Sequence, residues 1–274
     1  MLERVSSVSA LDLFRLHNRI AFITGAAGYL GRSISWGLAE AGAHVVLAGR
    51  NEKKLKELAY EITEKGLKAD AIKVDVRDEN SVQYAFSVIG KKHGRLHILV
   101  NNAYEGSGGT IETSSSESFL NSYEVALIGA FRCIKAALPL LRVAVSDTGS
   151  ASVINIASMY GIVSPDLRIY DSPKDSNPPF YGAAKAALIQ FTKYAACEYA
   201  KERIRVNAIS PGPFPKPEVL AQNPEFYRRL CTKTPLGRTG KPEELKGAVL
   251  FLASDASTFV TGINLIVDGG WTSL

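Results

Sequence analysis

Short apolar runs alternate with helical patterns along almost the whole chain. We expect strands at residues 20–23, 44–49, 69–76, 96–101, 151–157, 204–209 and 263–267. Helices are expected between nearly all of them, at residues 33–41, 52–65, 79–92, 117–142, 181–201 and 242–253. Because right-handed crossovers carry each helix onto one face of a sheet, this alternation predicts a parallel sheet. The expected fold class is α/β: a Rossmann-like, doubly wound sheet of seven parallel strands with helices on both faces.

A glycine-rich turn follows the first expected strand. Gly25, Gly28 and Gly31 stand between the apolar run 20–23 and the first helical pattern. Glycine allows a sharp turn and a close approach of the backbone to a pyrophosphate, and the helix behind the turn offers free N–H groups. Such turns also occur for structural reasons alone, but this position favours a dinucleotide site.

Composition limits the classes of protein to which the chain can belong. With 274 residues and 46% hydrophobic side chains, it can bury a full core, and we expect one Rossmann-fold domain at residues 20–274 behind a lead-in at residues 1–19. The net charge of +5 comes from scattered Lys and Arg, so no nucleic-acid partner is expected. The lead-in carries charges throughout, so no membrane span is expected. Three cysteines without metal-ligand spacing indicate a cytoplasmic protein without structural zinc.

One tyrosine and one lysine stand four positions apart in a strong helix-forming sequence, at Tyr181 and Lys185. Positions i and i+4 are neighbours on a helix, and a nearby ammonium lowers the pKa of a phenol. Tyr181 could then exchange a proton with a substrate oxygen near neutral pH. The alternative is an ordinary solvent-facing pair. A second pair with this spacing, Tyr170 and Lys174, contains Pro173 and cannot share a helical face.

Ser158 directly follows the apolar strand expected at residues 151–157. At that sheet edge its hydroxyl would face Tyr181 and could donate a hydrogen bond to a substrate oxygen. A serine at the end of a strand is also an ordinary cap or turn residue. We therefore predict a catalytic role for Ser158 only together with Tyr181.

With these residues, the chain resembles the short-chain dehydrogenase/reductase family, in its compact single-domain branch. The resemblance extends from Ile20 to Gly270 and rests on the glycine turn, Asp75-Val76, Asn101-Asn102-Ala103, Ser158/Tyr181/Lys185, Pro211-Gly212 and residues 260–262 and 267–270. It implies hydride transfer between a nicotinamide cofactor and an alcohol or carbonyl, with Lys185 also holding the nicotinamide ribose. It also implies a homotetramer or homodimer built partly on the two long helices.

The resemblance implies a set of cofactor contacts as well. They are Gly25, Gly28, Tyr29, Leu30, Arg50, Asp75, Val76, Asn101, Tyr181, Lys185, Pro211, Gly212 and Phe214. The second strand ends in Gly49 where NAD-selective pockets place a carboxylate, and Arg50 follows it. Because no acid would repel a 2′-phosphate and Arg50 could bind it, we expect NADP, with NAD as the alternative. Arg50 is otherwise a surface residue at the start of the next helix.

The chain departs from the family pattern at several places. Tyr29 stands where compact members usually carry Gly, and Tyr104 follows Asn102-Ala103 where Gly is usual. Ala126 occupies the place of a catalytic Asn that anchors a proton-relay water, although a backbone carbonyl could still hold that water. Ser158 and Tyr181 are also separated by more residues than is usual.

Two long Pro-rich connections, at residues 161–179 and 211–235, are expected to form lids or substrate walls, the second with a helical centre at 218–230. Candidate substrate contacts are Tyr104, Glu105, Tyr160, Arg168, Tyr170, Lys174, Phe180 and Phe214. This polar mixture indicates a polyhydroxylated sugar or sugar-acid substrate, with Arg168 or Lys174 as an anion partner. Those two charges could equally serve only to solvate a loop.

The leading hypothesis is therefore an NADP(H)-dependent oxidoreductase that interconverts an alcohol and a carbonyl. A nucleotide-binding sensor or scaffold protein is the main alternative, because Ala126 leaves the proton relay incomplete. A reductase of 3-oxoacyl thioesters is a further alternative, although neither long connection is conspicuously apolar.

Overall fold

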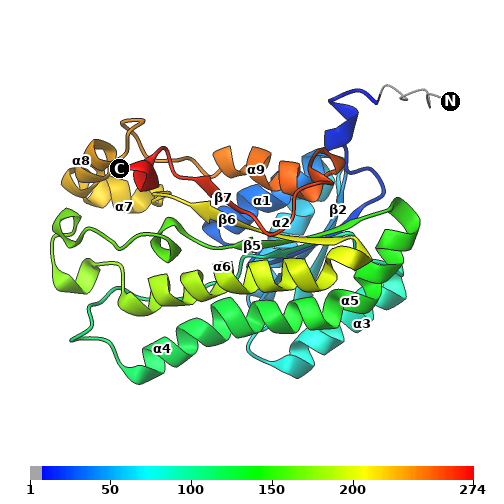
Figure 1. Cartoon of the computed structure of the whole chain (residues 1–274), viewed down its shortest axis with the longest axis horizontal. Coiled ribbons are helices and arrows are strands. Elements are labelled where there is room, and N and C mark those ends of the chain that lie inside the picture. Colours follow the sequence, from blue (N-terminus) through cyan, green and yellow to red (C-terminus); the bar gives the residue numbers. More distant parts are fainter. Residues whose placement is uncertain (1–7) are drawn as a thin grey trace.

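A computed structural model describes residues 8–274, and its centre is a sheet of seven parallel strands (Figure 1). The strands are β1 (Ile20–Thr24), β2 (His44–Gly49), β3 (Lys68–Lys73), β4 (Ile98–Asn101), β5 (Ala151–Ile156), β6 (Ile204–Pro211) and β7 (Asn264–Val267). Their order in the sheet is β3-β2-β1-β4-β5-β6-β7. The predicted fold class is confirmed.

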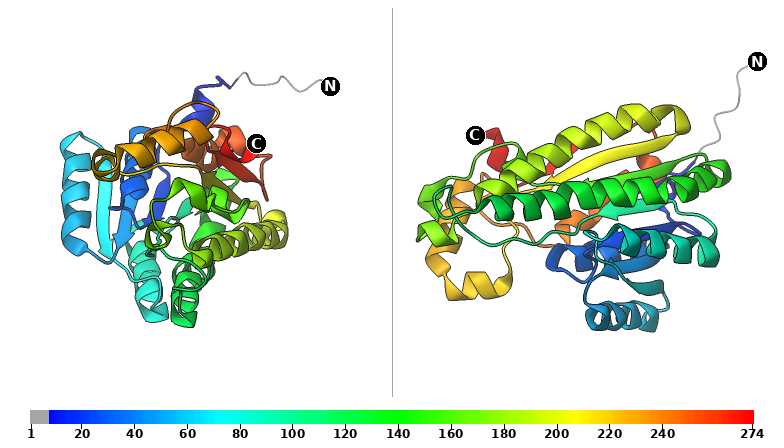
Figure 2. Two further views of the ribbon diagram at one scale, coloured as in Figure 1. Left: turned by 90° about the vertical axis from the view of Figure 1, so that its left-hand side faces the viewer. Right: turned by 90° about the horizontal axis from the view of Figure 1, so that it is seen from below.

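Helices cover both faces of this sheet (Figures 1 and 2). One face carries α1 (Tyr29–Glu40), α2 (Glu52–Glu64) and α9 (Glu244–Ala253), and the other carries α3 (Glu79–His93), α5 (Gly129–Thr148) and α6 (Pro179–Tyr199). A parallel strand covered on both sides must be apolar on both faces. In β1, Phe22 packs beside Phe86 of α3, whereas Ile23 belongs to the core that contains Ile34 of α1.

The bounds of several helices differ from the sequence-based expectation, and two of these differences have a clear local cause. Helix α1 begins at Tyr29 rather than at residue 33, because Gly28 already takes the N-cap position. The helix expected at residues 218–230 is two helices, α7 (Pro217–Gln222) and α8 (Pro224–Lys233). Asn223 separates them, since its Oδ1 accepts a hydrogen bond from the N–H of Phe226 and caps α8.

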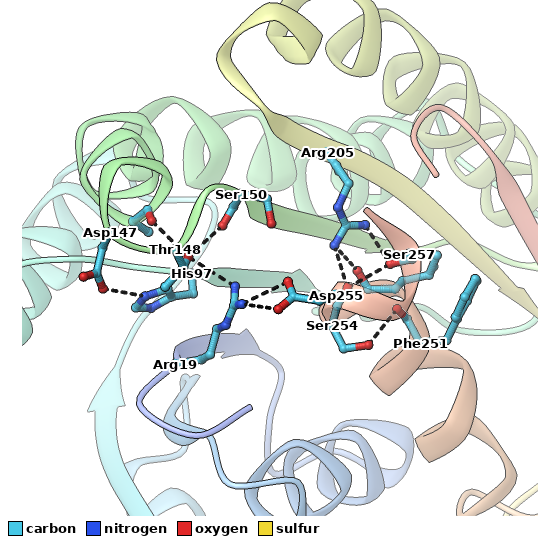
Figure 3. Close-up of polar contacts among 12 residues, drawn as sticks. Arg19, His97, Asp147, Thr148, Ser150, Arg205, Phe251, Ser254, Asp255 and Ser257 are labelled. Atoms are coloured by element: carbon cyan, nitrogen blue, oxygen red, sulfur yellow. Dashed lines mark hydrogen bonds and ion pairs between the residues drawn. The ribbon is translucent and has the colours of Figure 1, made fainter. Parts of the chain in front are cut away.

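A polar network holds the amino ends of the strands together (Figure 3). The guanidinium of Arg19 donates to both carboxylate oxygens of Asp255 at 2.9 and 2.8 Å and to Thr148 Oγ1 at 3.2 Å. Nearby, Arg205 donates to the carbonyl oxygens of Leu252 and Ser254. These contacts join the segment before β1 to the segment after α9. They all lie at the amino ends of the strands, away from the carboxyl ends.

Part of the expected lead-in packs onto the domain. Leu16 is fully buried, and its N–H donates to the carbonyl of Ala41. Residues 1–7 of that lead-in lie outside the described residues. From residue 8 onward, no helix combines the length and the apolarity that crossing a membrane requires.

Candidate active site

A cleft of about 550 Å³ opens at the carboxyl ends of the strands. It lies where β1 and β4 are neighbours, although the chain passes through β2 and β3 between them. Such a reversal of strand order is where doubly wound sheets bind their ligands, because the loops diverge there. The predicted residues that line this cleft are Gly25, Gly28, Tyr29, Leu30, Arg50, Asp75, Val76, Tyr181, Lys185 and Pro211.

Other predicted cofactor contacts lie elsewhere. Asn101 is buried behind the cleft, where its Nδ2 donates to Asn155 Oδ1 at 2.8 Å. Gly212 packs against Asp268, and Phe214 lines a separate cavity beside Gly240. The sequence could place these residues at the correct edge of the sheet, but not on one side of a loop or the other. Asn101, Gly212 and Phe214 thus do not line the cleft, and their role as cofactor contacts stays a prediction.

The glycine turn forms a cradle that fits a pyrophosphate. Gly25 has a φ of +63°, and a Cβ on Gly31 would overlap the carbonyl oxygen of Gly25. The side-chain amide of Asn102 donates to the carbonyls of Thr24 and Gly25, each at 3.1 Å, and fixes the turn. Gly28 offers no side-chain cap, so the first N–H groups of α1 are available to an anion.

Positive side chains lie at the far end of the cleft. Arg50, Lys54 and Arg77 line it, after β2 and after β3. Arg50 forms an ion pair with Glu105 at 2.9 Å, and Arg77 forms one with Asp75 at 2.7 Å. Of these three residues, only Arg50 was predicted as a cofactor contact. Arg77 follows β3 and could have been found by the rule that strand ends share one edge, whereas Lys54 lies within α2.

Tyr181 and Lys185 come from the first turns of α6, and Ser158 follows β5. The Lys185 ammonium donates to the carbonyl of Ile156 at 2.7 Å and lies 5.8 Å from the centre of the Tyr181 ring. Ser158 is buried beside the cleft without lining it, and its Oγ accepts from the N–H of Tyr160 at 3.1 Å. The structure therefore brings the predicted catalytic residues to one end of the cleft.

The electrostatics of this group differ from expectation. Burial raises the pKa of Tyr181, and the Ser158 hydroxyl acts in the opposite direction. Burial also lowers the pKa of Lys185 to about 7. The expected lowering of the phenol's pKa by Lys185 is thus not produced by these contacts. The ammonium is directed at the Ile156 carbonyl, and its own charge is only partly retained at neutral pH.

Tyr104 packs against the catalytic pair. Its ring meets that of Tyr181 edge to face at a centroid distance of 4.8 Å, and Lys185 Nζ lies 5.1 Å from its centre. The Tyr104 hydroxyl is 3.3 Å from that of Ser122. Burial raises the pKa of Tyr104 to about 12, so this phenol stays neutral at physiological pH. The sequence pattern predicted Tyr104 as a substrate contact and as a departure from the usual Gly, but not its contact with the Tyr181 ring.

A second cavity of about 260 Å³ adjoins the cleft at Tyr181. Its lining mixes polar and apolar groups and consists of Tyr104, Gly106, Ser107, Gly108, Tyr170, Asp175, Ser176, Asn177, Pro178 and Tyr181. Of the expected substrate contacts, Glu105 lines the first cleft instead, Phe180 packs against Phe119, and Tyr160 bonds to the Tyr170 hydroxyl at 3.1 Å.

The expected anion partners do not reach either cavity. The Arg168 side chain is 89% exposed and forms an ion pair with Asp166 at 2.9 Å. Lys174 is exposed and absent from both linings. Asp166 holds Arg168 at the surface because a bidentate guanidinium–carboxylate pair is short and well directed. This corrects the assignment of Arg168 or Lys174 as an anion partner.

A π-helical turn, Glu124–Ile128, interrupts the helix expected at residues 117–142 and separates α4 (Ser116–Tyr123) from α5. The N–H of Gly129 bonds back to the carbonyl of Glu124, five residues earlier. Ala126 is buried in this turn and lines a cavity of about 10 Å³, together with Asn101 and Lys185. That volume is close to the space that one water molecule needs.

Comparison with known proteins assigns the family. The model of a family described as enoyl-(acyl carrier protein) reductase matches residues 25–272. A short-chain type dehydrogenase/reductase from Mycobacterium marinum has a crystal structure that superposes with a TM-score of 0.86 at 32% identity, covering 97% of this chain and 100% of that one. The chain belongs to the short-chain dehydrogenase/reductase family. It is therefore an oxidoreductase of the class that acts on CH–OH and carbonyl groups.

Two further members of the family are similar over nearly their whole lengths. The rhamnolipids biosynthesis 3-oxoacyl-[acyl-carrier-protein] reductase of Pseudomonas aeruginosa is 34% identical over 260 residues, which cover 94% of this chain and 98% of that protein. The crystal structure of a gluconate 5-dehydrogenase from Burkholderia cenocepacia, in complex with NADP and tartrate, has a TM-score of 0.86 at 34% identity and covers 97% and 100%. These short-chain dehydrogenases/reductases act on chemically different substrates.

Proposed function

We propose that the protein is an NADP(H)-dependent oxidoreductase that interconverts an alcohol and a carbonyl in a polyhydroxylated, sugar-like substrate. The observation that carries this proposal is the position of Tyr181, which lines both the large cleft and the adjoining polar cavity. A substrate oxygen held in the smaller cavity can therefore meet the phenol at the end of the cofactor cleft. The proposed oxidoreductase domain comprises residues 20–274.

Each catalytic side chain has a distinct proposed role. The Tyr181 hydroxyl gives a proton to the substrate oxygen during reduction and takes it back during oxidation. Ser158 donates a hydrogen bond to the same oxygen as negative charge develops there. Lys185 holds the ribose next to the nicotinamide and keeps the phenol oriented. NADP(H), when bound, supplies or accepts the hydride.

The choice of NADP is supported by the charge of the cleft. Arg50 and Lys54 line its far end, and the residue at the end of β2 is Gly49, which brings no negative charge. A guanidinium can bind a 2′-phosphate with two parallel hydrogen bonds. The NADP complex of the Burkholderia gluconate 5-dehydrogenase agrees with this choice.

The substrate class is supported by the polar residues on the lining of the smaller cavity. Hydroxyl groups of Ser107, Tyr170 and Ser176 belong to residues on that lining. Asn177 lies there too, and its buried Oδ1 has no hydrogen-bond partner among residues 8–274. A buried acceptor without a partner is unfavourable, so a substrate hydroxyl that donates to Asn177 would be stabilised. Neutral hydroxylated compounds fit this lining better than anions, because Asp175 is its only charged member in the described chain.

The reduction of 3-oxoacyl thioesters is a second candidate. The Pseudomonas aeruginosa reductase and the family description favour it. An acyl chain, however, needs an apolar channel, and within residues 8–274 no Val, Leu, Ile, Met or Phe lines the cavity next to Tyr181. A sensor or scaffold without turnover is the third candidate, and it depends on whether the proton relay is complete.

We infer that Asn101 supports the relay in place of a side chain at Ala126. The Oδ1 of Asn101 is buried and has no hydrogen-bond partner within the described chain. It belongs to a residue on the 10 Å³ cavity that also borders Ala126 and Lys185. One water molecule there could donate to Asn101 and accept from Lys185, which would connect Lys185 to a proton path.

The test compares cofactors first and substrates second. Purified protein is titrated with NADPH and NADH by fluorescence, and NADPH oxidation is then followed with keto-sugars, sugar-acid ketones and 3-oxoacyl thioesters. We expect tighter binding of NADPH, oxidation with a keto-sugar, and loss of at least about 100-fold in kcat for Tyr181→Phe. Turnover only with thioesters would overturn the substrate class. Tight NADPH binding without any turnover would favour the sensor.

We also propose a homotetramer or homodimer. Phe131 of α5 and Tyr194 of α6 expose 45% and 65% of their surfaces on the two long helices. Exposed aromatic side chains on neighbouring helices suit an interface between copies of the chain.

A further inference from the structure

Two histidines and an aspartate meet at the end of the sheet opposite the cofactor cleft. His44 is the first residue of β2, Asp70 lies in β3, and His93 is the last residue of α3. In the register of the two strands Asp70 is paired with Val46, two residues after His44. His44 and Asp70 therefore point to the same face of the sheet, which is the face that α3 covers.

Three potential ligand atoms converge at this place. His44 Nε2 lies 2.9 Å from Asp70 Oδ2, and His93 Nε2 lies 3.1 Å from the same oxygen. The two imidazole rings are packed edge to face at a centroid distance of 4.6 Å. All three ligand atoms lie within 4.8 Å of one another. The side chains are 22%, 24% and 9% exposed for His44, Asp70 and His93, so an ion can enter from solvent and still be largely enclosed.

We propose that His44, Asp70 and His93 form a binding site for a divalent transition-metal ion such as Zn²⁺. Zinc binds imidazole nitrogen and carboxylate oxygen at about 2.0–2.2 Å, which puts tetrahedral ligand atoms roughly 3.3–3.5 Å apart. The observed separations need only small side-chain movements to reach that geometry. Two histidines and one carboxylate also match the donors that zinc, copper and nickel prefer over calcium or magnesium. Water would complete the coordination.

Lys92 gives the site a competitor. Its ammonium lies 2.6 Å from Asp70 Oδ1, on the other oxygen of the same carboxylate. The ammonium repels a divalent ion and occupies a lone pair of Asp70, so it must move or share the carboxylate when metal binds. The Lys92 side chain is 55% exposed and can turn into solvent. Removal of this charge should therefore strengthen metal binding, whereas a purely structural hydrogen-bond cluster predicts no such effect.

The site is independent of the proposed catalytic chemistry. It lies at the amino ends of β2 and β3, whereas the cofactor cleft lies at the carboxyl ends. A bound ion would join two neighbouring strands to the end of α3 and stabilise this edge of the sheet, because an ion that binds only the folded state favours that state. The expected readout is affinity and thermal stability rather than turnover.

Zinc titration by calorimetry tests the proposal. The protein is first treated with EDTA, and Cys197→Ser with Cys231→Ser forms the background, so that these accessible thiols cannot bind the ion. We expect one Zn²⁺ per chain with micromolar or tighter affinity and a rise in Tm. Asp70→Asn and His93→Gln should each weaken binding at least tenfold, and Lys92→Gln should strengthen it about threefold or more.

The exposed His17, outside the cluster, provides the matched control through His17→Gln. This variant should bind zinc like its parent, and NADPH affinity should be equal in all variants. The proposal is overturned if the parent binds no zinc, or if Asp70→Asn and His93→Gln bind it as tightly as His17→Gln. Loss of binding in Lys92→Gln would also overturn it. Circular dichroism identifies any variant that fails to fold, and the other cluster variant then decides the result.

Discussion

At the scale of single residues, the proposed active site depends on a lysine that the fold keeps in an unfavourable place. Lys185 is 3% exposed, and within the described part of the chain its ammonium makes one hydrogen bond, to the carbonyl of Ile156 at 2.7 Å. Burial lowers its pKa from 10.5 to about 7. Below pH 7 the buried group is charged and the folded state bears the full cost of desolvation. The buried ammonium next to Tyr181 therefore lowers the free energy of unfolding.

Lys185→Met should therefore stabilise the protein while abolishing turnover. At pH 7 we expect its free energy of unfolding to exceed that of the parent by about 4 kcal/mol, because each unit by which burial lowers the pKa of Lys185 costs roughly 1.4 kcal/mol. Between pH 7 and 10.5 the unfolded lysine binds more protons than the folded one, so the parent gains stability as the pH rises. Urea unfolding at pH 7 and pH 9.5 measures the difference in the free energy of unfolding between the two proteins. This difference should be smaller at pH 9.5. An equal difference at both pH values would contradict desolvation of Lys185 as the cause.

At the scale of elements, the junction of α4 and α5 decides how the small cavity beside Lys185 is built. The sequence pattern predicts a regular helix there. In the structure the π-helical turn Glu124–Ile128, which contains Ala126, replaces the ordinary α-helical hydrogen bonds. π-turns inside helices are frequent at functional sites. The cavity has about the volume of one water, and Asn101, whose buried Oδ1 has no hydrogen-bond partner among residues 8–274, is one of its lining residues. The π-helical turn and the side chain of Asn101 at the end of β4 thus form this cavity together.

Asn101→Leu should lower kcat at least about tenfold and leave NADPH affinity nearly unchanged, because it removes an acceptor for the proposed water without altering the cofactor cleft. Ala126→Asn in the same background should restore part of the loss. Ser33→Ala is the matched control, since Ser33 Oγ is also buried without a partner among residues 8–274 but Ser33 does not line this cavity. Steady-state kinetics distinguish the variants. Unchanged kcat in Asn101→Leu would eliminate Asn101 from the relay.

At the scale of the whole molecule, the two ends of the sheet differ: the carboxyl ends of the strands form the cleft, and the amino ends form a network of polar contacts. The amino ends carry ion pairs and buried polar groups that join distant segments, as Figure 3 shows for Arg19 and Asp255. His97 belongs to this network, and its Nδ1 accepts a hydrogen bond from the N–H of Ile20 at 2.9 Å. That bond requires a neutral nitrogen. Burial, aided by the charge of Arg19, lowers the pKa of His97 to about 4.

This network should make the protein sensitive to mild acid. Between pH 6.5 and 4 the unfolded His97 is protonated and the folded one is not, so stability falls as the pH falls through this window. On going from pH 7 to pH 5, the parent should lose about 2 kcal/mol more than His97→Asn, in which an amide oxygen can replace the ring acceptor. Chemical denaturation at both pH values gives the difference. Equal losses in the two proteins would refute a role for His97.

The sequence by itself determined the fold and most of the cleft. The periods of apolar residues are local properties, and parallel strands must expose their carboxyl ends at one edge. Residues after strands, such as Gly25, Arg50 and Asp75, could therefore be assigned to the cleft from their positions alone. Tyr181 and Lys185 followed from the spacing of one helix.

Only the tertiary structure decided which side chains touch and what charge they carry. The ring of Tyr104 packs against that of Tyr181, and Asn101 lines the cavity beside Lys185. Both contacts join residues of separate elements, so they depend on how those elements pack. The pKa of Lys185 depends on desolvation by the whole fold. His44, Asp70 and His93 come from three elements, and no local pattern in the sequence connects them. Long-range register and burial are properties of the packed chain, so the sequence pattern could not reveal them.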